Sequence, residues 1–163
     1  MTRTAAVLVA STRAATGVYE DTTGPLIAGW LVGAGFEPTE PVVTADGEPF
    51  ATALAAALLD RPDFVITSGG TGISPTDRTA TITEAALDYL IPGIAEEIRR
   101  QGAAKIPTAI LSRGVAGVSG RTLVVNLPGS RGGVKDGLAV LAGVLDHALD
   151  QLAGGDHIRT EDA

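Results

Sequence analysis

The stretch VITSGGTGISPTDRT, residues 65–79, decides the fold of this chain. It begins with an apolar run, which is typical of a parallel strand buried on both faces. Three glycines follow within residues 69–72, and Asp77 comes shortly after them. A buried strand that ends in a glycine-rich turn and leads into a helix is half of a βαβ unit. The segment therefore predicts an α/β fold.

The rest of the chain continues this alternation. Strand-like apolar runs occupy residues 4–10, 41–45 and 63–67. Helical patterns occupy residues 23–35, 47–61, 81–90, 93–103 and 132–155, and two β-like runs around Ser119 and Gly120 predict a hairpin. Alternating strands and helices form a mostly parallel sheet with helices on both faces. We expect one three-layer α/β/α domain over residues 1–163 with a short hairpin and a frayed tail from about residue 154.

Composition limits the function. A net charge of -7 argues against general affinity for nucleic acid or an anionic membrane, so an anionic ligand would need a local site. Because the chain has no cysteine, disulfides, thiolate metal sites and a cysteine nucleophile are excluded. The N-terminus shows no signal peptide, and no apolar stretch approaches the roughly 20 residues of a membrane-spanning helix. We expect a cytoplasmic protein.

Two glycine-containing turns are candidate binding loops. One spans residues 68–72, and the other follows Asn126 with the sequence LPGS, residues 127–130. Parallel sheets bind ligands at the carboxyl ends of their strands, where exposed N–H groups and a helix start can hold an anion. The alternative is that both are ordinary tight connections. Neither turn is a Walker A loop, and neither places G-x-G-x-x-G after the first strand, so a P-loop NTPase or a dinucleotide dehydrogenase is not supported.

Four motifs in order carry a family resemblance. TSGGTGISPTDRT at residues 67–79, LSR at 111–113, LVVNLPGS at 123–130 and an early STR at 11–13 resemble the MogA/MoaB proteins of molybdenum cofactor biosynthesis. The resemblance covers about residues 4–153. It implies a MogA-like fold, also found in the G domain of gephyrin-type proteins, and a homo-oligomer, either a trimer or a hexamer.

The resemblance also implies a reaction. MogA-type enzymes transfer AMP from ATP to molybdopterin with Mg²⁺ and release pyrophosphate; the activated pterin then accepts molybdate, which a molybdenum-insertion enzyme can supply. Asp46 and Asp77 match the family's acidic residues and would be catalytic residues and Mg²⁺ ligands. Substrate contacts would come from Ser11 and Arg13, from Ser68, Gly69, Gly70, Thr71 and Gly72, and from Ser112, Arg113, Asn126, Pro128, Gly129 and Ser130.

Other interpretations of these residues stay open. Asp77 could be a helix N-cap, Asp46 could form an Asx-turn before Gly47, and Arg113 could be solvated surface. The chain also departs from the family pattern, with Thr12 where an aspartate is common and Arg131 where a proline is common. A MoaB-like binding protein without transfer activity, or a CinA-type nucleotide-cleaving enzyme, is therefore an alternative to the adenylyltransferase.

Overall fold

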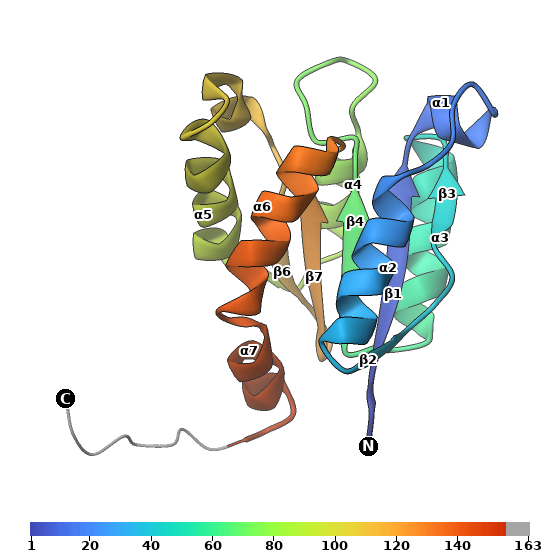
Figure 1. Ribbon diagram of the computed structural model, residues 1–163. Coiled ribbons are helices and arrows are strands. Elements are labelled where there is room, and N and C mark those ends of the chain that lie inside the picture. The colour runs from blue at the N-terminus through green and yellow to red at the C-terminus, as the bar shows by residue number, and fades with distance from the viewer. Residues whose placement is uncertain (156–163) are drawn as a thin grey trace.

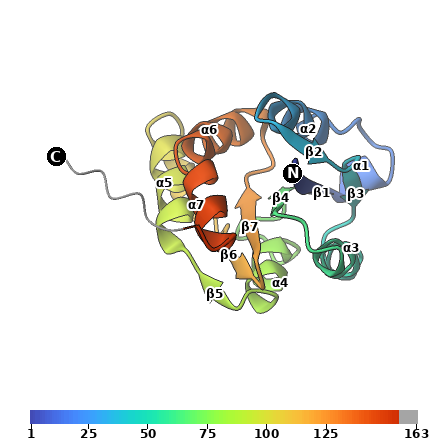
Figure 2. The ribbon, with the colours of Figure 1, turned by 90° about the horizontal axis from the view of Figure 1, so that it is seen from below.

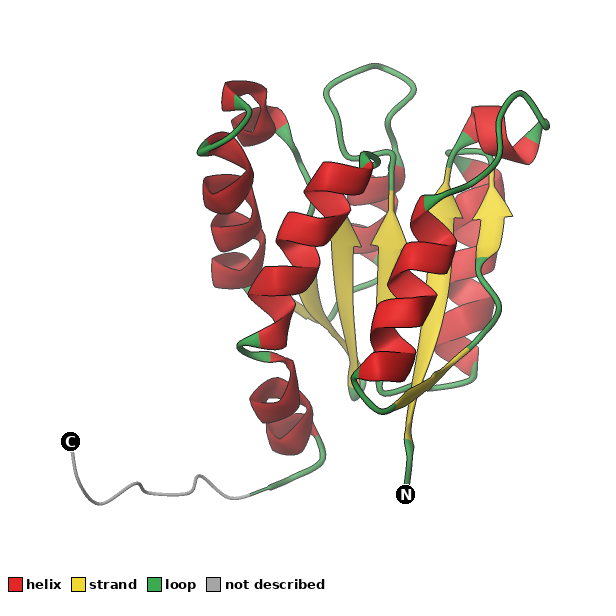
Figure 3. Ribbon diagram, in the orientation of Figure 1, coloured by secondary structure: helices red, strands yellow, loops and turns green. Residues whose placement is uncertain are grey.

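The computed structural model describes residues 1–155, in which one sheet is covered by helices on both faces (Figures 1 and 2). The strands are β1 (Arg3–Ala10), β2 (Phe36–Pro38), β3 (Val42–Thr44), β4 (Phe64–Ser68), β5 (Tyr89–Leu90), β6 (Ala116–Ser119) and β7 (Thr122–Leu127). The α-helices are α1 (Thr12–Ala15), α2 (Thr23–Gly33), α3 (Glu48–Leu59), α4 (Thr79–Ala85), α5 (Pro92–Ala103), α6 (Arg131–Ala142) and α7 (Leu145–Leu152), with a 3₁₀ turn, η1, at Pro107–Leu111 (Figure 3). The predicted three-layer α/β/α fold is confirmed.

The sheet runs in the order β2-β1-β4-β7-β6-β5, and β3 also pairs with β1 beyond the end of β2. The pairs among β1, β2, β3, β4 and β7 are parallel, whereas β6 pairs antiparallel with both β7 and β5. The carboxyl ends of β1, β3, β4 and β7 therefore meet at one edge of the molecule, at the top of Figure 1. Gly120, with φ +60°, makes the predicted hairpin between β6 and β7.

Two apolar cores hold the layers together, one on each face of the sheet. Successive side chains of a strand point to opposite faces, so Val7 of β1 packs in one core and Leu8 in the other. Helices α2, α5, α6 and α7 cover the first face, and α3 and α4 cover the second (Figure 2). This burial on both sides explains why β1, β4 and β7 are apolar throughout.

The helix predicted over residues 81–90 is wrong at both ends. Helix α4 begins at Thr79 and stops at Ala85, and Tyr89 and Leu90 form strand β5 instead. The Asp88 carboxylate accepts a hydrogen bond from Gly120 N at 2.7 Å, and Asp88 N donates to Val118 O at 2.8 Å. These contacts with the hairpin outweigh the helical pattern, because tertiary contacts commonly override a weak local propensity.

The helix predicted over residues 132–155 is two helices. It breaks at Gly143 and Val144, where Gly143 N bonds three residues back to Val140 O. Glycine is a poor helix former, and the break lets Leu145 and Leu149 of α7 reach the core. Helix α7 ends at Leu152, three residues before the predicted end, and Gly154 N and Gly155 N bond back to Gln151 O and Asp150 O. The remainder of the predicted frayed tail, residues 156–163, lies outside the described residues.

The sequence did not predict three short elements, because each is too short to show a helical or strand periodicity. Strand β2 contains a proline, α1 has four residues, and η1 has five. Within residues 1–155, no helix has both the length and the apolar composition that a membrane span requires.

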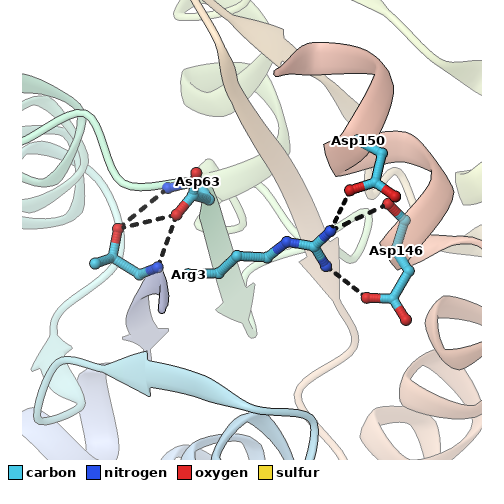
Figure 4. A network of polar contacts seen from close by, with 5 residues as sticks. Arg3, Asp63, Asp146 and Asp150 are labelled. Carbon is cyan, nitrogen blue, oxygen red and sulfur yellow. Dashed lines mark hydrogen bonds and ion pairs between the residues drawn. The ribbon is translucent and has the colours of Figure 1, made fainter. Parts of the chain in front are cut away.

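A polar network ties the start of β1 to its neighbours at the opposite edge of the sheet (Figure 4). Arg3 forms ion pairs with Asp146 at 2.5 Å and Asp150 at 2.6 Å, both on α7. On the other side, Thr4 N donates to Asp63 Oδ2 at 2.7 Å, just before β4. The guanidinium thus holds the last described helix, α7, against the start of β1.

We expect Arg3→Gln to lower the free energy of unfolding by about 1 kcal/mol in low salt, because partly exposed ion pairs contribute up to about that much. The difference from wild type should shrink in high salt, which screens surface charges. Urea unfolding at two salt concentrations measures this. The control is Arg100→Gln, which removes the ion pair with Glu97 inside α5 and leaves the contact between α7 and the sheet intact. If Arg3→Gln unfolds like wild type at low salt, the network does not anchor α7.

Candidate functional site

The two glycine-containing turns touch each other at the carboxyl ends of β4 and β7. Ser68 Oγ donates to Pro128 O at 2.9 Å, and Gly69 N donates to Leu127 O at 3.1 Å. A Cβ at Gly129 would stand 3.3 Å from Gly69 Cα. The structure therefore places both candidate binding turns at the same edge of the sheet and in direct contact.

Positive φ angles at Gly69 and Gly70 shape the first turn. Their φ values are +92° and +65°, in the region that glycine occupies more readily than other residues. A Cβ at position 69 would collide with the carbonyl oxygen of Ala10, and one at position 70 would collide with Asp46 Oδ2 and Thr79 Oγ1. The turn thus passes tightly between the end of β1 and the side chains that surround Asp46.

Asp46 is a half-buried carboxylate held by three donors. Its Oδ1 accepts hydrogen bonds from Gly47 N at 2.7 Å and Thr79 Oγ1 at 3.1 Å, and its Oδ2 accepts one from Arg78 N at 3.1 Å. The bond to Gly47 joins adjacent residues, so it is not the Asx-turn that the sequence allowed as an alternative, in which the carboxylate accepts the N–H two residues further on. The bonds to Arg78 and Thr79 reach the start of α4, 32 and 33 residues further along the chain, so Asp46 also fixes that helix.

Asp77 lies against the other end of the glycine-rich turn. A Cβ at Gly72 would stand 2.5 Å from Asp77 Oδ2, and this oxygen accepts a hydrogen bond from Ser74 N at 3.1 Å. The alternative that Asp77 is the N-cap of α4 is wrong. Arg78 is the N-cap, without a capping side-chain bond, and Asp46 bonds the first residues of the helix instead.

The first loop, residues 11–13, contacts the backbone N–H of Asp46. Ser11 caps α1 by accepting a hydrogen bond from Ala14 N at 3.2 Å, and its hydroxyl also lies 3.0 Å from the Tyr19 hydroxyl. Thr12 Oγ1 accepts a bond from Asp46 N at 3.4 Å. Arg13 is exposed. The predicted site residues Ser11 and Arg13 thus flank Thr12, the residue of this loop that contacts Asp46.

Arg113 binds the backbone of the glycine-rich loop. Its Nε donates to Gly72 O at 2.9 Å, and its two terminal nitrogens donate to Asp77 O and to Thr81 Oγ1. The guanidinium predicted to contact substrate thus joins the two ends of the 72–77 loop. Ser112 lies beside it, with its carbonyl bonded by Arg99 at 3.3 Å.

Asn126 supports the site from beneath. The side chain is buried, and its Nδ2 donates to Thr67 Oγ1 at 2.9 Å and to Thr83 Oγ1 at 3.0 Å. Its Oδ1 accepts a hydrogen bond from Val115 N at 3.2 Å. Because both amide hydrogens and the carbonyl are engaged within the protein, Asn126 connects β4, α4 and the approach to β6. The side chain predicted to contact substrate thus has protein partners for its polar groups.

A pocket of about 420 Å³ opens beside these turns, between α5, η1 and α6. Ligand pockets of proteins are commonly about 300–1,000 Å³, so a small organic molecule fits here. Its wall includes apolar side chains such as Ile98, Ile106 and Leu111. Five predicted site residues line it: Thr71, Gly72, Ser112, Pro128 and Ser130. Asp46 and Asp77 are not in its wall, so the site has a pocket side and a carboxylate side, with Gly72 between them.

Some residues at the site were missed by sequence reasoning. Thr79 is fully buried and holds Asp46, and Asp136 lines the pocket in an ion pair with Lys105 at 2.5 Å. Asp136 shares a face of α6 with Gly132 and Gly133, four and three residues earlier, which also line the pocket. None of the predicted site residues lies within α6, so their positions did not indicate it. Arg131, which stands where a proline is common in the family, donates to Thr22 O at 3.1 Å. Lys135 lines a separate groove against α2.

Comparisons with known proteins identify the family to which this fold belongs. Residues 6–147 match the family model described as a probable molybdopterin binding domain. The chain therefore belongs to the MogA/MoaB family of molybdopterin-binding proteins.

Individual relatives differ in how much of their length is matched. The chain is 33% identical over 152 residues to a molybdopterin adenylyltransferase of Helicobacter pylori, covering 91% of this chain and 86% of the relative. It is 38% identical over 154 residues to a molybdenum cofactor biosynthesis bifunctional protein of Chlorobaculum tepidum, covering 93% of this chain. The chain spans only about half the length of that relative, 49%.

Solved structures show the same fold. The molybdopterin biosynthesis Mog protein of Mycobacterium ulcerans is 60% identical, with a TM-score of 0.89 over 92% of this chain and 99% of that one. The molybdopterin biosynthesis enzyme MoaB of Thermus thermophilus is 40% identical, with a TM-score of 0.83 over 94% of this chain and 98% of that one. Both branches of the family are therefore among its structural neighbours.

We expect Arg113→Ala to loosen the 72–77 loop, because it removes donors to the carbonyls of Gly72 and Asp77. Backbone amides in the loop should exchange with deuterium faster, while those of the buried strand β4 should not change. Hydrogen exchange followed by mass spectrometry measures both. The control is Arg131→Ala, whose guanidinium bonds to Thr22 O instead. Equal exchange in the loop for wild type and Arg113→Ala would contradict the role of Arg113.

Proposed function

We propose that this protein is a molybdopterin adenylyltransferase, which transfers AMP from ATP to molybdopterin and releases pyrophosphate. One observation carries the proposal. Asp46 and Asp77 come from different parts of the chain and lie against Gly70 and Gly72, and Gly72 is also part of the wall of an apolar pocket. A carboxylate pair beside a glycine-rich backbone suits phosphate chemistry, and the adjoining pocket suits an organic ring system.

The reaction is a substitution at phosphorus. A phosphate oxygen of molybdopterin attacks the α-phosphorus of ATP, a new P–O bond forms, and the bond from the α-phosphorus to the bridging oxygen breaks as pyrophosphate leaves. Catalysis of such steps rests on positioning and on stabilising charge. In the proposed site, backbone N–H groups of the glycine-rich turn orient phosphate oxygens, and the pocket side holds the pterin.

The carboxylates fit a Mg²⁺ ion shared with the substrates. Asp46 Oδ2 accepts a hydrogen bond from Arg78 N and Asp77 Oδ2 accepts one from Ser74 N, and a carboxylate oxygen that accepts one hydrogen bond keeps a lone pair for a cation. Within residues 1–155, no group of three or more His, Cys, Asp or Glu side chains could hold a metal ion by itself. Mg²⁺ commonly takes one or two carboxylates and completes its shell with phosphate and water oxygens. When bound, the ion would neutralise charge on the reacting phosphates.

A molybdopterin-binding protein without transfer activity is the second candidate. It is favoured by Thr12, which stands where related enzymes carry an aspartate in the first loop, and whose hydroxyl contacts the backbone of Asp46. Retention of both Asp46 and Asp77 favours the enzyme. The two candidates differ in one product, adenylyl-molybdopterin, which only the enzyme forms from ATP.

We expect Asp46→Asn to lower AMP transfer by at least about 100-fold, because loss of roughly 2.7 kcal/mol of transition-state stabilisation has that effect. Binding of molybdopterin should survive. The amide can accept bonds on one atom only, so some loss of stability is expected too, about 1 kcal/mol for one missing hydrogen bond. Single-turnover kinetics at saturating Mg²⁺, with melting temperatures alongside, separate the two effects.

The matched control is Asp88→Asn, which changes a carboxylate that accepts a backbone N–H from Gly120 in the hairpin. It should keep full transfer activity. Wild-type turnover by a folded Asp46→Asn variant would mean that Asp46 only supports the turn and α4. A wild-type protein that binds molybdopterin and ATP but forms no adenylyl-molybdopterin would establish the second candidate.

We also propose a homotrimer, on the basis of the family and of helix α2. This helix has no charged residue, and it leaves Val32 62% exposed on the surface. Light scattering should give a mass near three times the 16.5 kDa of the chain at micromolar concentration. Val32→Glu should lower that mass, whereas Leu59→Glu on α3, also at an exposed site, should not. A monomeric wild-type protein would contradict the proposal.

A further inference from the structure

The pocket runs along α6 away from the glycine-containing turns. Ser130, Gly132, Gly133 and Asp136 of this helix line it in succession. Ser130 follows Gly129, which packs against Gly69, so this end of the pocket adjoins the turns. At a rise of 1.5 Å per residue, Asp136 lies about 9 Å further along the helix. A ligand whose phosphate meets the turns therefore extends its other end toward Asp136.

Asp136 stands out in the pocket wall by its chemistry. Among the described residues that line the pocket, it is the only acid, and its side chain is 16% exposed. The walls around it are largely apolar, with Ile98, Ile106 and Ala109 among them. Lys105 Nζ lies 2.5 Å from Asp136 Oδ1, and the lysine side chain is 69% exposed. The lysine contacts Oδ1, and because Asp136 lines the pocket, its carboxylate can also accept hydrogen bonds from a ligand.

This pair is complementary to one edge of a pterin. The pyrimidine ring of a pterin carries two adjacent donors, the N3–H and the 2-amino group, next to the 4-carbonyl acceptor. A carboxylate can accept two parallel N–H bonds, and an ammonium group can donate to a carbonyl. Asp136 would take the two donors while Lys105 neutralises the carboxylate and donates to the 4-carbonyl. The apolar walls would cover the faces of the rings.

We propose that Asp136, with Lys105, reads the 2-amino-4-oxo edge of the pterin and so determines the specificity of the pocket. This inference rests on the proposed function, because it assumes that molybdopterin enters this pocket with its phosphate at the glycine-containing turns. The alternative is a purely structural role, in which the ion pair between Lys105 and Asp136 only joins the end of α5 to α6.

Two small probes that differ at one position test the proposal. The 2-amino group of 6-hydroxymethylpterin is a donor, whereas 6-hydroxymethyllumazine has a carbonyl acceptor at that position. Titration calorimetry with wild-type protein should show a preference for the pterin of about tenfold or more, since a hydrogen bond to a charged group has an effect of that size. In Asp136→Asn the side-chain amide offers N–H donors, so the preference should vanish or reverse in favour of the lumazine.

The matched control is Glu97→Gln. Glu97 lies on α5 in an ion pair with Arg100 and is not in the pocket wall. The hydrogen bond from Arg100, with a second from Gln101, lowers the pKa of Glu97 to about 2, so this substitution also removes a full negative charge. It should leave the preference for the pterin intact. Asp136→Ser, which removes the carboxylate with a small side chain, should behave like Asp136→Asn and serves if the latter does not fold.

The outcomes separate this inference from the proposed function. Wild-type protein that forms adenylyl-molybdopterin but binds both probes equally, or a folded Asp136→Asn protein that keeps the wild-type preference, overturns the role of Asp136 alone. Wild-type protein that prefers the pterin tenfold but forms no adenylyl-molybdopterin supports Asp136 in a binding protein and overturns the transferase. Guanosine serves as a further probe with the same donor edge; binding as tight as the pterin would overturn the specificity for pterins.

Discussion

The close approach of Gly69 to the end of β1 is the constraint on which the site depends. Any side chain at position 69 would collide with the carbonyl oxygen of Ala10, and Gly129 packs against the other side of Gly69. The ends of β1, β4 and β7 are thus brought together through glycine backbone. The connection from β1 leads to β2 and β3 on one side, while β4 and β7 continue on the other. Open parallel sheets form their binding crevice where the strand order reverses in this way.

Several polar residues of the motifs hold this crevice in shape from behind. Ser68 bonds to the backbone of Pro128, Asn126 joins β4 to α4, and Arg113 joins Gly72 to Asp77. Each leaves few or no hydrogen-bonding groups for a ligand in this structure. A residue of a family motif can therefore be required because it supports the loops, and not only because it contacts the substrate. What the loops then present is their own N–H groups and the two aspartates.

The sequence predicted the parts of the structure that depend on local pattern. Both faces of β4 are buried, so its apolar run indicated a central strand, and the glycines after it indicated the turn. It could not predict features that depend on distant contacts. The break at Gly143 depends on α7 reaching the core, and β5 depends on the hairpin bonding Asp88. Asp77 resembled a helix cap locally, but Arg78 is the N-cap, and Asp46, far away in the chain, accepts hydrogen bonds from Arg78 and Thr79 at the start of the helix.

The distribution of positive charge bears on how the proposed reaction could work in an acidic protein. The chain carries a net charge of -7, and both proposed substrates are anions. Arg113 is bonded to loop carbonyls, Lys105 is paired with Asp136, and Arg13 is exposed beside the loop that contacts Asp46. Side-chain cations alone would then offset little of the repulsion between two phosphate groups that meet beside two carboxylates. Backbone donors from the glycine-rich turn and a divalent cation held by those carboxylates would have to offset the remaining negative charge. This would explain why two aspartates lie in a site that binds anions.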